Sequence, residues 1–371
     1  MIPNNLVGKR IFVSGGSGVI GQELLPKLLA SGATVFSGDL KPAPIELLGK
    51  VIFREGDLNT LTQEEFDDFE PDIFIHLAAA FERSIESSEF FTPNFTHNLQ
   101  LTQKMFEFCN KSKTIKKVIY ASSYLIYESN TYLGELLHRD PYKLHESSEI
   151  GPRNLVGLSK YYGERQLEFL SPNSSGTFSW AAIRIFRGFG KNSRCIISRW
   201  VRSLLENQKI EVYGEECSFD YIYAEQTAEG ILRIANEPNA IGIINLGTGA
   251  STSIKEIVKI LKYEFPEAEI DYINQDMKIE KTFASITKLN ETIGWIPFKP
   301  INESIREIIE HEKNKLIAFE SPGLLISSAG NKVPLIEAIA NELKWEARSR
   351  RLLIADSNPK VLTNNLDNDF V

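Results

Sequence analysis

The sequence predicts an α/β fold with three parts: a doubly wound parallel sheet, a smaller mixed α/β lobe and a C-terminal βαβ appendage. Three observations favour this fold. Short apolar runs, typical of strands buried on both faces, alternate with helical patterns up to residue 187. A glycine-rich turn joins the first run to a helix, and beyond residue 187 the elements become short and mixed in order. We therefore expect a nucleotide-binding domain at 1–187, a substrate lobe at 188–310 that partly interleaves with it, and the appendage at 311–371.

The first run and its turn, Arg10–Gly21, predict a binding site for a pyrophosphate. The turn supplies three glycines at spacings of three, and the helix begins within it: Gly15, Gly18, Gly21, Val19 and Ile20. A tight turn and a close approach of backbone to phosphate both require residues without a Cβ. The first helical turn adds unpaired N–H groups and a positive dipole end. Strand, turn and helix together indicate a dinucleotide site.

An acidic residue supports that interpretation. Asp39 ends the second apolar run, eighteen residues after Gly21. A carboxylate at this place can accept both ribose hydroxyls of a dinucleotide and would repel a 2′-phosphate. The sequence therefore predicts NAD as the cofactor in preference to NADP.

Further strands and helices follow in alternation, as a parallel sheet covered on both faces requires. In the first domain we expect strands at 33–37, 51–54, 72–76, 117–121 and 178–186, and long helices at 93–111 and 154–170. In the lobe we expect helices at 198–205, 227–235 and 254–265, and strands at 210–213 and 243–246.

Composition excludes several functional classes. The 371 residues are 42% hydrophobic and 24% charged, with a net charge of −8 and no basic patch, so we expect no nucleic-acid partner. The three cysteines are far apart, as in a reduced cytoplasmic protein. No apolar stretch is long enough to span a bilayer, and residues 1–9 lack the core of a signal peptide. The loop at 128–151 carries acidic residues and histidines, but their spacing fits no metal pattern, so we expect no metal.

These motifs resemble the extended short-chain dehydrogenase/reductase family, especially its NAD-dependent nucleotide-sugar epimerases and dehydratases, from Val7 to about Glu310. Besides the glycine turn and Asp39, the matching positions are Asp57-Leu58, His76-Leu77-Ala78-Ala79, Asn98, Ser122-Ser123, Tyr127, Ser159-Lys160, Glu164, Arg184–Gly190, Val212–Gly214, Asn245–Gly247 and Ile293–Pro297. The resemblance implies a Rossmann fold, NAD as cofactor and a nucleotide-linked sugar as substrate. It also implies cofactor-binding roles for Asp57, Leu58, Leu77, Ala78, Ala79, Asn98 and Lys160.

The same resemblance implies a catalytic site with one departure. The family places a Tyr four residues before a Lys on one helix face, so that the phenolate can take a proton from a substrate hydroxyl held by a Ser. Here the Lys is Lys160 and the Ser is Ser123, but the Tyr position holds Val156. Valine cannot transfer a proton.

Three interpretations of this departure remain open. Another group supplies the acid and base, the candidates being Tyr124, Tyr127, Glu146, His138 and His145. Alternatively, the protein is a non-catalytic NAD-binding sensor or scaffold that has kept the fold. In the third, Tyr161 or Tyr162 serves instead, although both follow Lys160 directly and point away from it on a helix. We adopt the enzyme as the working hypothesis.

A second departure concerns the substrate. Many members of the family carry an Arg directly before the Asp that matches Asp220, where it grips the diphosphate, but this chain has Phe219 there. Arg187 and Arg194, helped by Arg199, are the substrate-binding residues that we expect to replace it. Alternatively, these arginines only solvate a helix.

The resemblance ends near His311. The pattern at 323–355, a strand, a small-residue turn, a helix and a second strand, resembles the opening of the domain that precedes the nucleotide fold of ATP-grasp ligases. The tail therefore either docks on the main domain or belongs to a longer fusion.

The family resemblance also implies a homodimer through the helices at 93–111 and 154–170. Phe106 and Phe169 lie either in that contact or against the sheet.

Overall fold

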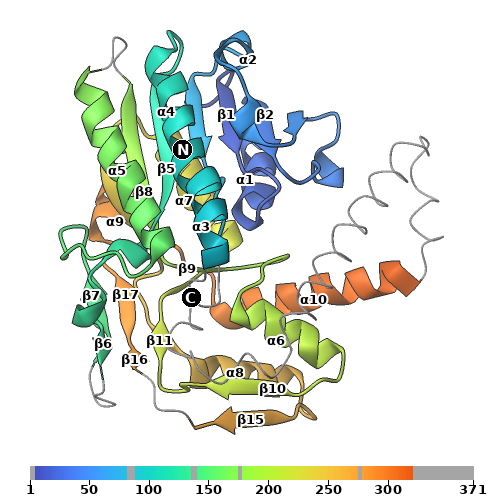
Figure 1. Cartoon of the computed structure of the whole chain (residues 1–371). Coiled ribbons are helices and arrows are strands. Elements are labelled where there is room, and N and C mark those ends of the chain that lie inside the picture. The colour runs from blue at the N-terminus through green and yellow to red at the C-terminus, as the bar shows by residue number, and fades with distance from the viewer. Residues whose placement is uncertain (1–4, 82–87, 135–139, 174–177, 275–277, 321–371) are drawn as a thin grey trace.

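The computed structural model describes residues 5–81, 88–134, 140–173, 178–274 and 278–320. Most of the expected appendage, including its two strands, lies outside the described residues. The remaining chain forms a large sheet domain and a smaller lobe that lies against one end of it (Figure 1).

A seven-stranded sheet in the order β13-β8-β5-β4-β1-β2-β3 forms the large domain. Its strands are β1 (Arg10–Ser14), β2 (Thr34–Asp39), β3 (Ile52–Glu55), β4 (Ile73–His76), β5 (Lys117–Ser123), β8 (Ser179–Ile185) and β13 (Gly242–Leu246). Every neighbouring pair is parallel. The order runs outward from β1 in both directions, so the predicted doubly wound parallel sheet is confirmed.

Helices cover both faces of this sheet, and alternate residues of β1 enter the two resulting cores. Ile11 and Val13 pack with α1 (Val19–Ala30), α7 (Ala224–Asn236) and α9 (Thr287–Ile293). Phe12 packs on the other face with α2 (Gln63–Asp68), α4 (Leu101–Lys111) and α5 (Leu155–Asn173). Burial on both faces explains why the strands have continuous apolar sequences.

The smaller lobe has its own apolar core and several two-stranded pairs. Its elements are α6 (Ile196–Leu205), β10 (Ile210–Tyr213), α8 (Ile254–Glu264), β15 (Ile270–Ile273) and α10 (Ile301–Glu320). Short pairs connect it to the sheet domain: β9 (Arg187–Phe189) with β12 (Tyr221–Tyr223), β11 (Ser218–Phe219) with β14 (Thr252–Ser253), β6 (Leu133–Gly134) with β16 (Ile279–Glu280), and β7 (Tyr142–Leu144) with β17 (Thr282–Ala284). Because β13 and α7 return to the large sheet, the chain interleaves the two parts.

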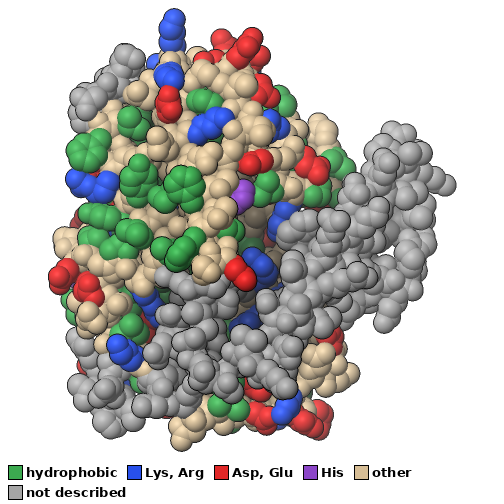
Figure 2. Space-filling model, viewed as in Figure 1, with side chains coloured by type: hydrophobic (Ala, Val, Ile, Leu, Met, Phe, Trp, Pro, Cys, Tyr) green, Lys and Arg blue, Asp and Glu red, His purple; other side chains and the backbone are tan. Residues whose placement is uncertain are grey.

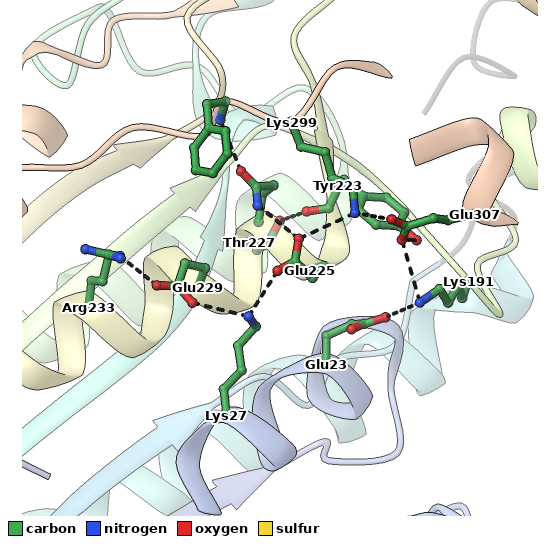
Figure 3. Close-up of polar contacts among 12 residues, drawn as sticks. Glu23, Lys27, Lys191, Tyr223, Glu225, Thr227, Glu229, Arg233, Lys299 and Glu307 are labelled. Carbon is green, nitrogen blue, oxygen red and sulfur yellow. Dashed lines mark hydrogen bonds and ion pairs between the residues drawn. The ribbon is translucent and has the colours of Figure 1, made fainter. Parts of the chain in front are cut away.

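A network of ion pairs joins α1, the helix that follows the glycine turn, to α7 and α10 (Figure 3). Its pairs are Lys27–Glu225 at 3.0 Å, Lys27–Glu229 at 3.2 Å, Lys299–Glu225 at 3.8 Å, Lys191–Glu23 at 3.7 Å and Lys191–Glu307 at 3.8 Å, together with Lys299–Glu307. The network therefore ties α1 both to α7 on the large sheet and to α10 of the smaller lobe.

Candidate functional site

The glycine turn connects β1 to α1, and its glycines have different reasons to be glycine. Gly15 has φ +80°, and a Cβ there would lie 2.6 Å from the Ala78 nitrogen. A Cβ on Gly21 would lie 2.4 Å from the Gly15 oxygen. Packing within the protein therefore requires both residues to be glycine.

Gly18 is different, because the nearest atom to a Cβ there would be the Gly15 oxygen at 3.2 Å. Gly18 is the N-cap of α1, with no capping side chain and no acidic residue in the first helical turn. The helix N-terminus thus keeps its positive end and has little side-chain bulk over it. This arrangement fits a pyrophosphate.

Asp39 is anchored to the same turn. Its Oδ2 accepts a hydrogen bond from the Ser17 N–H at 3.0 Å, and its Oδ1 accepts one from the Lys41 N–H at 3.0 Å. Each carboxylate oxygen can accept a second hydrogen bond. The half-buried side chain is therefore held in place while keeping acceptor sites for ribose hydroxyls.

Asp57 and Leu58 follow β3. Asp57 Oδ1 accepts from the Asn59 N–H at 2.9 Å and caps a single 3₁₀ turn, while Leu58 is buried against Gly38. A Cβ on Gly38 would lie 2.5 Å from Leu58 Cδ2. These contacts place the pair at the end of the second strand, next to Asp39, and its cofactor-binding role remains a prediction.

Asn98 holds the strip Leu77–Ala80. Its Oδ1 accepts from the Ala80 N–H at 2.7 Å, and its amide nitrogen donates to the Ala80 carbonyl at 2.9 Å and to Asn94 Oδ1 at 2.7 Å. Both amide hydrogens are thus used within the protein, so we assign Asn98 a positioning role. It lies in a π-helical segment, Phe95–Gln100, between α3 (Ser88–Asn94) and α4, where the sequence predicts one regular helix. Such segments are frequent at functional sites.

Lys160 lies on α5 with its ammonium buried over an aromatic ring. Its Nζ is 4.9 Å from the centroid of the Tyr120 ring, and the residue is 7% exposed. Burial lowers the pKa of Lys160 to about 8. Its neighbour His76 is held neutral, since burial and the Lys160 charge lower the pKa of His76 to about 3. His76 bridges Ser14 at 2.6 Å and Thr102 at 3.0 Å and is a structural residue.

The structure brings the end of β5 and the start of α5 together. Ser123 Oγ accepts from the Leu125 N–H at 3.2 Å, and among the described residues its own hydrogen has no acceptor and can donate to a ligand. The Leu125 carbonyl accepts from the Arg153 N–H at 2.9 Å, and a Cβ on Gly157 would lie 2.5 Å from it. Val156, between these two contact points, is 3% exposed.

Two other positions of the motifs named above, Glu164 and Arg184, have structural roles. Glu164 and Arg184 form a buried bidentate pair with distances of 2.8 and 3.0 Å, and Ser122 donates to the same carboxylate at 2.5 Å. This group fastens α5 to β5 and β8. It leaves no free carboxylate oxygen of Glu164 for proton transfer.

Two of the alternative acid/base candidates, Tyr127 and Glu146, hold neighbouring segments of the chain together by hydrogen bonds. Tyr127 donates to Asn245 Oδ1 at 2.6 Å, and burial raises the pKa of Tyr127 to about 12. Glu146 accepts from the Asn245 N–H at 2.9 Å. His145 is exposed, and His138 lies outside the described residues. These contacts engage the Tyr127 hydroxyl and one oxygen of Glu146 in holding Asn245.

Tyr124 remains, directly after Ser123. Its hydroxyl donates to Glu280 Oε1 at 3.4 Å. Burial, reinforced by Glu280, raises the pKa of Tyr124 to about 12, against the opposing charges of Arg187 and Arg153. Tyr124 therefore combines proximity to Ser123 in the chain with a carboxylate partner.

Sequence reasoning missed the partner of Tyr124. Glu280 forms an ion pair with Arg153 at 2.5 Å, with side chains 2% and 8% exposed. The two residues are 127 positions apart. No local motif signals this pair.

Of the two expected substrate-binding arginines, Arg187 packs on an aromatic ring and Arg194 is exposed. The Arg187 guanidinium carbon lies 3.8 Å from the centroid of the Phe219 ring, so it rests on the side chain that stands where the family has its Arg. Arg194 is exposed in the segment before α6. The structure thus brings Arg187, but not Arg194, into contact with the segment around Asp220.

Comparisons with known proteins agree with this geometry. The model of the family described as "NAD dependent epimerase/dehydratase family" matches residues 11–247. A protein of Methanocaldococcus jannaschii, provisionally named a UDP-glucose 4-epimerase, is 26% identical, with 82% of this chain and 98% of the relative covered. The UDP-glucose 4-epimerase of Mycolicibacterium smegmatis is 23% identical, with coverage of 82% and 99%.

Solved structures resemble the chain over a similar length. MoeE5 in complex with UDP-glucose and NAD has a TM-score of 0.72 at 24% identity, covering 83% of this chain and 99% of that one. The UDP-glucuronic acid 4-epimerase of Bacillus cereus, in complex with UDP-glucuronic acid and NAD, has a TM-score of 0.72 at 21% identity, with coverage of 82% and 99%. Within the described ranges, no group of acidic, His and Cys residues could hold a metal ion, and no helix is long and apolar enough to cross a membrane.

Proposed function

The chain belongs to the NAD dependent epimerase/dehydratase family, and we propose that it is an enzyme that binds NAD and acts on a nucleotide-linked sugar by hydride transfer. The observation that carries this proposal is the cradle formed by the glycine turn and Asp39. Its helix N-terminus has little side-chain bulk over it at Gly18, and its carboxylate is fixed to the Ser17 N–H. Relatives of similar length and fold are named for nucleotide-sugar chemistry.

In this proposal the cofactor lies along the carboxyl ends of the central strands. The N-terminus of α1 would hold the pyrophosphate, Asp39 the adenosine ribose, and Lys160 the nicotinamide half. When bound, NAD supplies the hydride acceptor. The strip Leu77–Ala80, fixed by Asn98, gives the cofactor a wall of small residues.

We further propose that Ser123 and Tyr124 replace the usual Ser and Tyr pair at the sugar. Ser123 has a hydrogen free to donate to a sugar oxygen. The Tyr124 oxygen would accept the proton of the reacting hydroxyl while its own proton passes along the hydrogen bond to Glu280 Oε1. Arg187 and Arg194 are the proposed substrate-binding arginines.

The cofactor preference follows from Asp39. We expect NAD to bind at least tenfold more tightly than NADP, because the carboxylate repels a 2′-phosphate. Calorimetric titration with both cofactors measures this. Asp39→Ala should weaken NAD binding and narrow the difference between the NAD and NADP affinities. Asp72→Ala removes a carboxylate from the opposite edge of the sheet, where the strands begin, and should change neither affinity. NADP binding equal to or tighter than NAD binding would contradict the assignment.

Val156 offers a direct test of which group carries the proton. Val156→Tyr should lower any sugar-directed activity at least tenfold, since a ring at a 3% exposed position would obstruct the substrate side of Lys160. Overpacking should also cost about 1–3 kcal/mol of unfolding free energy. The matched control is Val7→Tyr, because Val7 is 66% exposed. A gain of activity in Val156→Tyr would instead mean that Tyr124 is not the proton carrier.

The proposed homodimer has a visible candidate surface. Hydrophobic side chains gather over α3, α4 and α5 (Figure 2). The exposed ones on these helices and the π-helical segment are Phe91, Phe95, Leu158, Tyr162 and Phe169. Phe106 is fully buried against the sheet, so of the two expected contact residues only Phe169, at 66% exposure, is available for a dimer.

We expect light scattering to show a dimer that Phe169→Glu and Phe95→Glu convert to monomer, because a buried unpaired carboxylate is costly at an apolar contact. Phe298→Glu is the control, since Phe298 is 75% exposed away from this surface. A wild-type protein that stays monomeric at every concentration would reject the dimer.

A further inference from the structure

A buried charged cluster lies where β16, β9, the end of β5 and the start of α5 meet. Its centre is Glu280, whose carboxylate pairs with Arg153 at 2.5 Å and accepts from the Tyr124 hydroxyl at 3.4 Å. Both Glu280 oxygens are therefore engaged. Arg153 and Glu280 are 8% and 2% exposed, so solvent does little to screen them.

A second guanidinium, that of Arg187, faces the same cluster without a carboxylate of its own. Its carbon lies 3.8 Å above the Phe219 ring and 5.8 Å from the centroid of Tyr221. Arg187 Nη1 is buried and has no hydrogen-bond partner in the part of the chain that the structure describes. The hydroxyl of Tyr132, a residue only 3% exposed, is likewise buried. Arg153 interacts with its oxygen, and among the described residues no acceptor lies in reach of its hydrogen.

The charges of this cluster do not cancel. Two guanidiniums, Arg153 and Arg187, share one carboxylate, Glu280. The phenols around them are neutral at pH 7, because burial raises the pKa of Tyr124 to about 12 and raises the pKa values of Tyr132 and Tyr221 further. Within the part of the chain that the structure describes, one positive charge and two buried donors are thus left unsatisfied, which is unfavourable unless an anion binds.

We propose that Arg187, assisted by Arg153 and the Tyr132 hydroxyl, binds the carboxylate of a nucleotide-linked uronic acid, a substrate class that rests on the proposed function. The planar guanidinium suits a carboxylate. The diphosphate is the other anion of such a substrate that Arg187 could bind. The cluster, however, includes Tyr124, next to Ser123, and Arg153, three residues before Val156. Because these residues belong to the proposed catalytic site, we place the cluster at the sugar end of the substrate.

The test is calorimetric titration of the NAD-loaded protein with UDP, UDP-glucose and UDP-glucuronic acid. We expect UDP-glucuronic acid to bind about tenfold or more tightly than UDP-glucose, since a neutral sugar leaves Arg187 unpaired. Arg187→Gln should weaken UDP-glucuronic acid binding by about 10–100-fold and remove the preference, while UDP affinity stays unchanged. Tyr132→Phe should reduce only UDP-glucuronic acid binding, severalfold. Arg165→Gln, on the exposed side of α5, is the control.

Two outcomes would decide against the proposal. Equal binding of the two sugars by the native protein would overturn the carboxylate site while leaving the proposed function standing. Equal losses for all three ligands in Arg187→Gln would mean that Arg187 grips the diphosphate. If Arg187→Gln does not fold, as judged by lost NAD binding, the same comparison is made with Arg187→Lys and Tyr132→Phe. Unchanged binding of UDP-glucuronic acid in both variants would overturn the proposal. Failure of UDP itself to bind would count against the proposed function.

Discussion

Lys160→Met is expected to stabilise the protein without cofactor and, at the same time, to weaken NAD binding by at least tenfold. The Lys160 ammonium is buried, and burial lowers the pKa of Lys160 from 10.5 to about 8. At about 1.4 kcal/mol per pKa unit, that shift corresponds to a cost of about 3 kcal/mol at neutral pH. The variant also loses the contact of the ammonium with the Tyr120 ring, which costs about 1 kcal/mol. The net increase in the unfolding free energy is therefore about 2 kcal/mol.

The pH dependence of the stabilisation in Lys160→Met follows from the direction in which burial shifts the pKa of Lys160. Below pH 8 the side chain is charged in both the folded and unfolded states, so the full cost of burial applies. Between pH 8 and 10.5 the unfolded state binds more protons, and the stability of the native protein rises toward that of the variant. Thermal melts at several pH values should therefore show a difference that is largest below pH 8 and shrinks above it.

Lys117 is the matched control for this experiment. Burial also lowers the pKa of Lys117 to about 8, but its Nζ donates to the carbonyls of Ile234 at 2.6 Å and Glu237 at 2.5 Å. Lys117→Met removes the donor for two carbonyls and should destabilise the protein by about 1–3 kcal/mol, with NAD affinity unchanged. A Lys160→Met protein that is less stable below pH 8, or that binds NAD as tightly as before, would contradict the proposed role.

Tyr124→Phe is expected to have the largest effect on catalysis. Removing the proposed proton carrier should lower kcat by about 10²–10⁴-fold, while NAD affinity changes little because the cofactor cradle lies at Gly18 and Asp39. Steady-state kinetics with a nucleotide sugar, together with cofactor titration, measure both quantities. The loss should be in kcat more than in KM, since the proton moves in the transition state.

Tyr127→Phe separates this role from simple loss of a buried hydroxyl. Tyr127 also carries a buried hydroxyl, which bonds Asn245 at 2.6 Å. Its removal should cost about 1 kcal/mol of stability and leave kcat within a few-fold of the native value. Equal kinetic losses in the two variants would mean that Tyr124 acts only as a structural residue.

The dinucleotide half of the site could be predicted from the sequence because its parts are local. Strand, glycine turn, helix and the acid at Asp39 lie within 30 consecutive residues, and each has a backbone reason that a single sequence reveals. The parallel sheet could be predicted for a similar reason, since strands buried on both faces have continuous apolar sequences.

The substrate half could not be predicted in the same way. Arg153 and Glu280 meet across 127 positions through β16, a strand of two residues. The π-helical segment contains Asn98, whose side chain bonds to Ala80 outside the helix, and helical periodicity does not reveal this contact. The buried orientation of Phe106 was one of two that its spacing allowed, and only packing against the sheet decides between them.

The most direct test of the central claim is to mix the NAD-loaded protein with UDP-glucose and, separately, with UDP-glucuronic acid, and to record the absorbance band of reduced nicotinamide while analysing the sugar products. We predict hydride transfer with at least one of them, seen as a reduced-nicotinamide signal or as a sugar altered at its stereochemistry or oxidation level, and its loss in Tyr124→Phe. Tight NAD binding with neither signal, across these and other nucleotide sugars, would contradict an enzymatic role and support a non-catalytic NAD-binding protein.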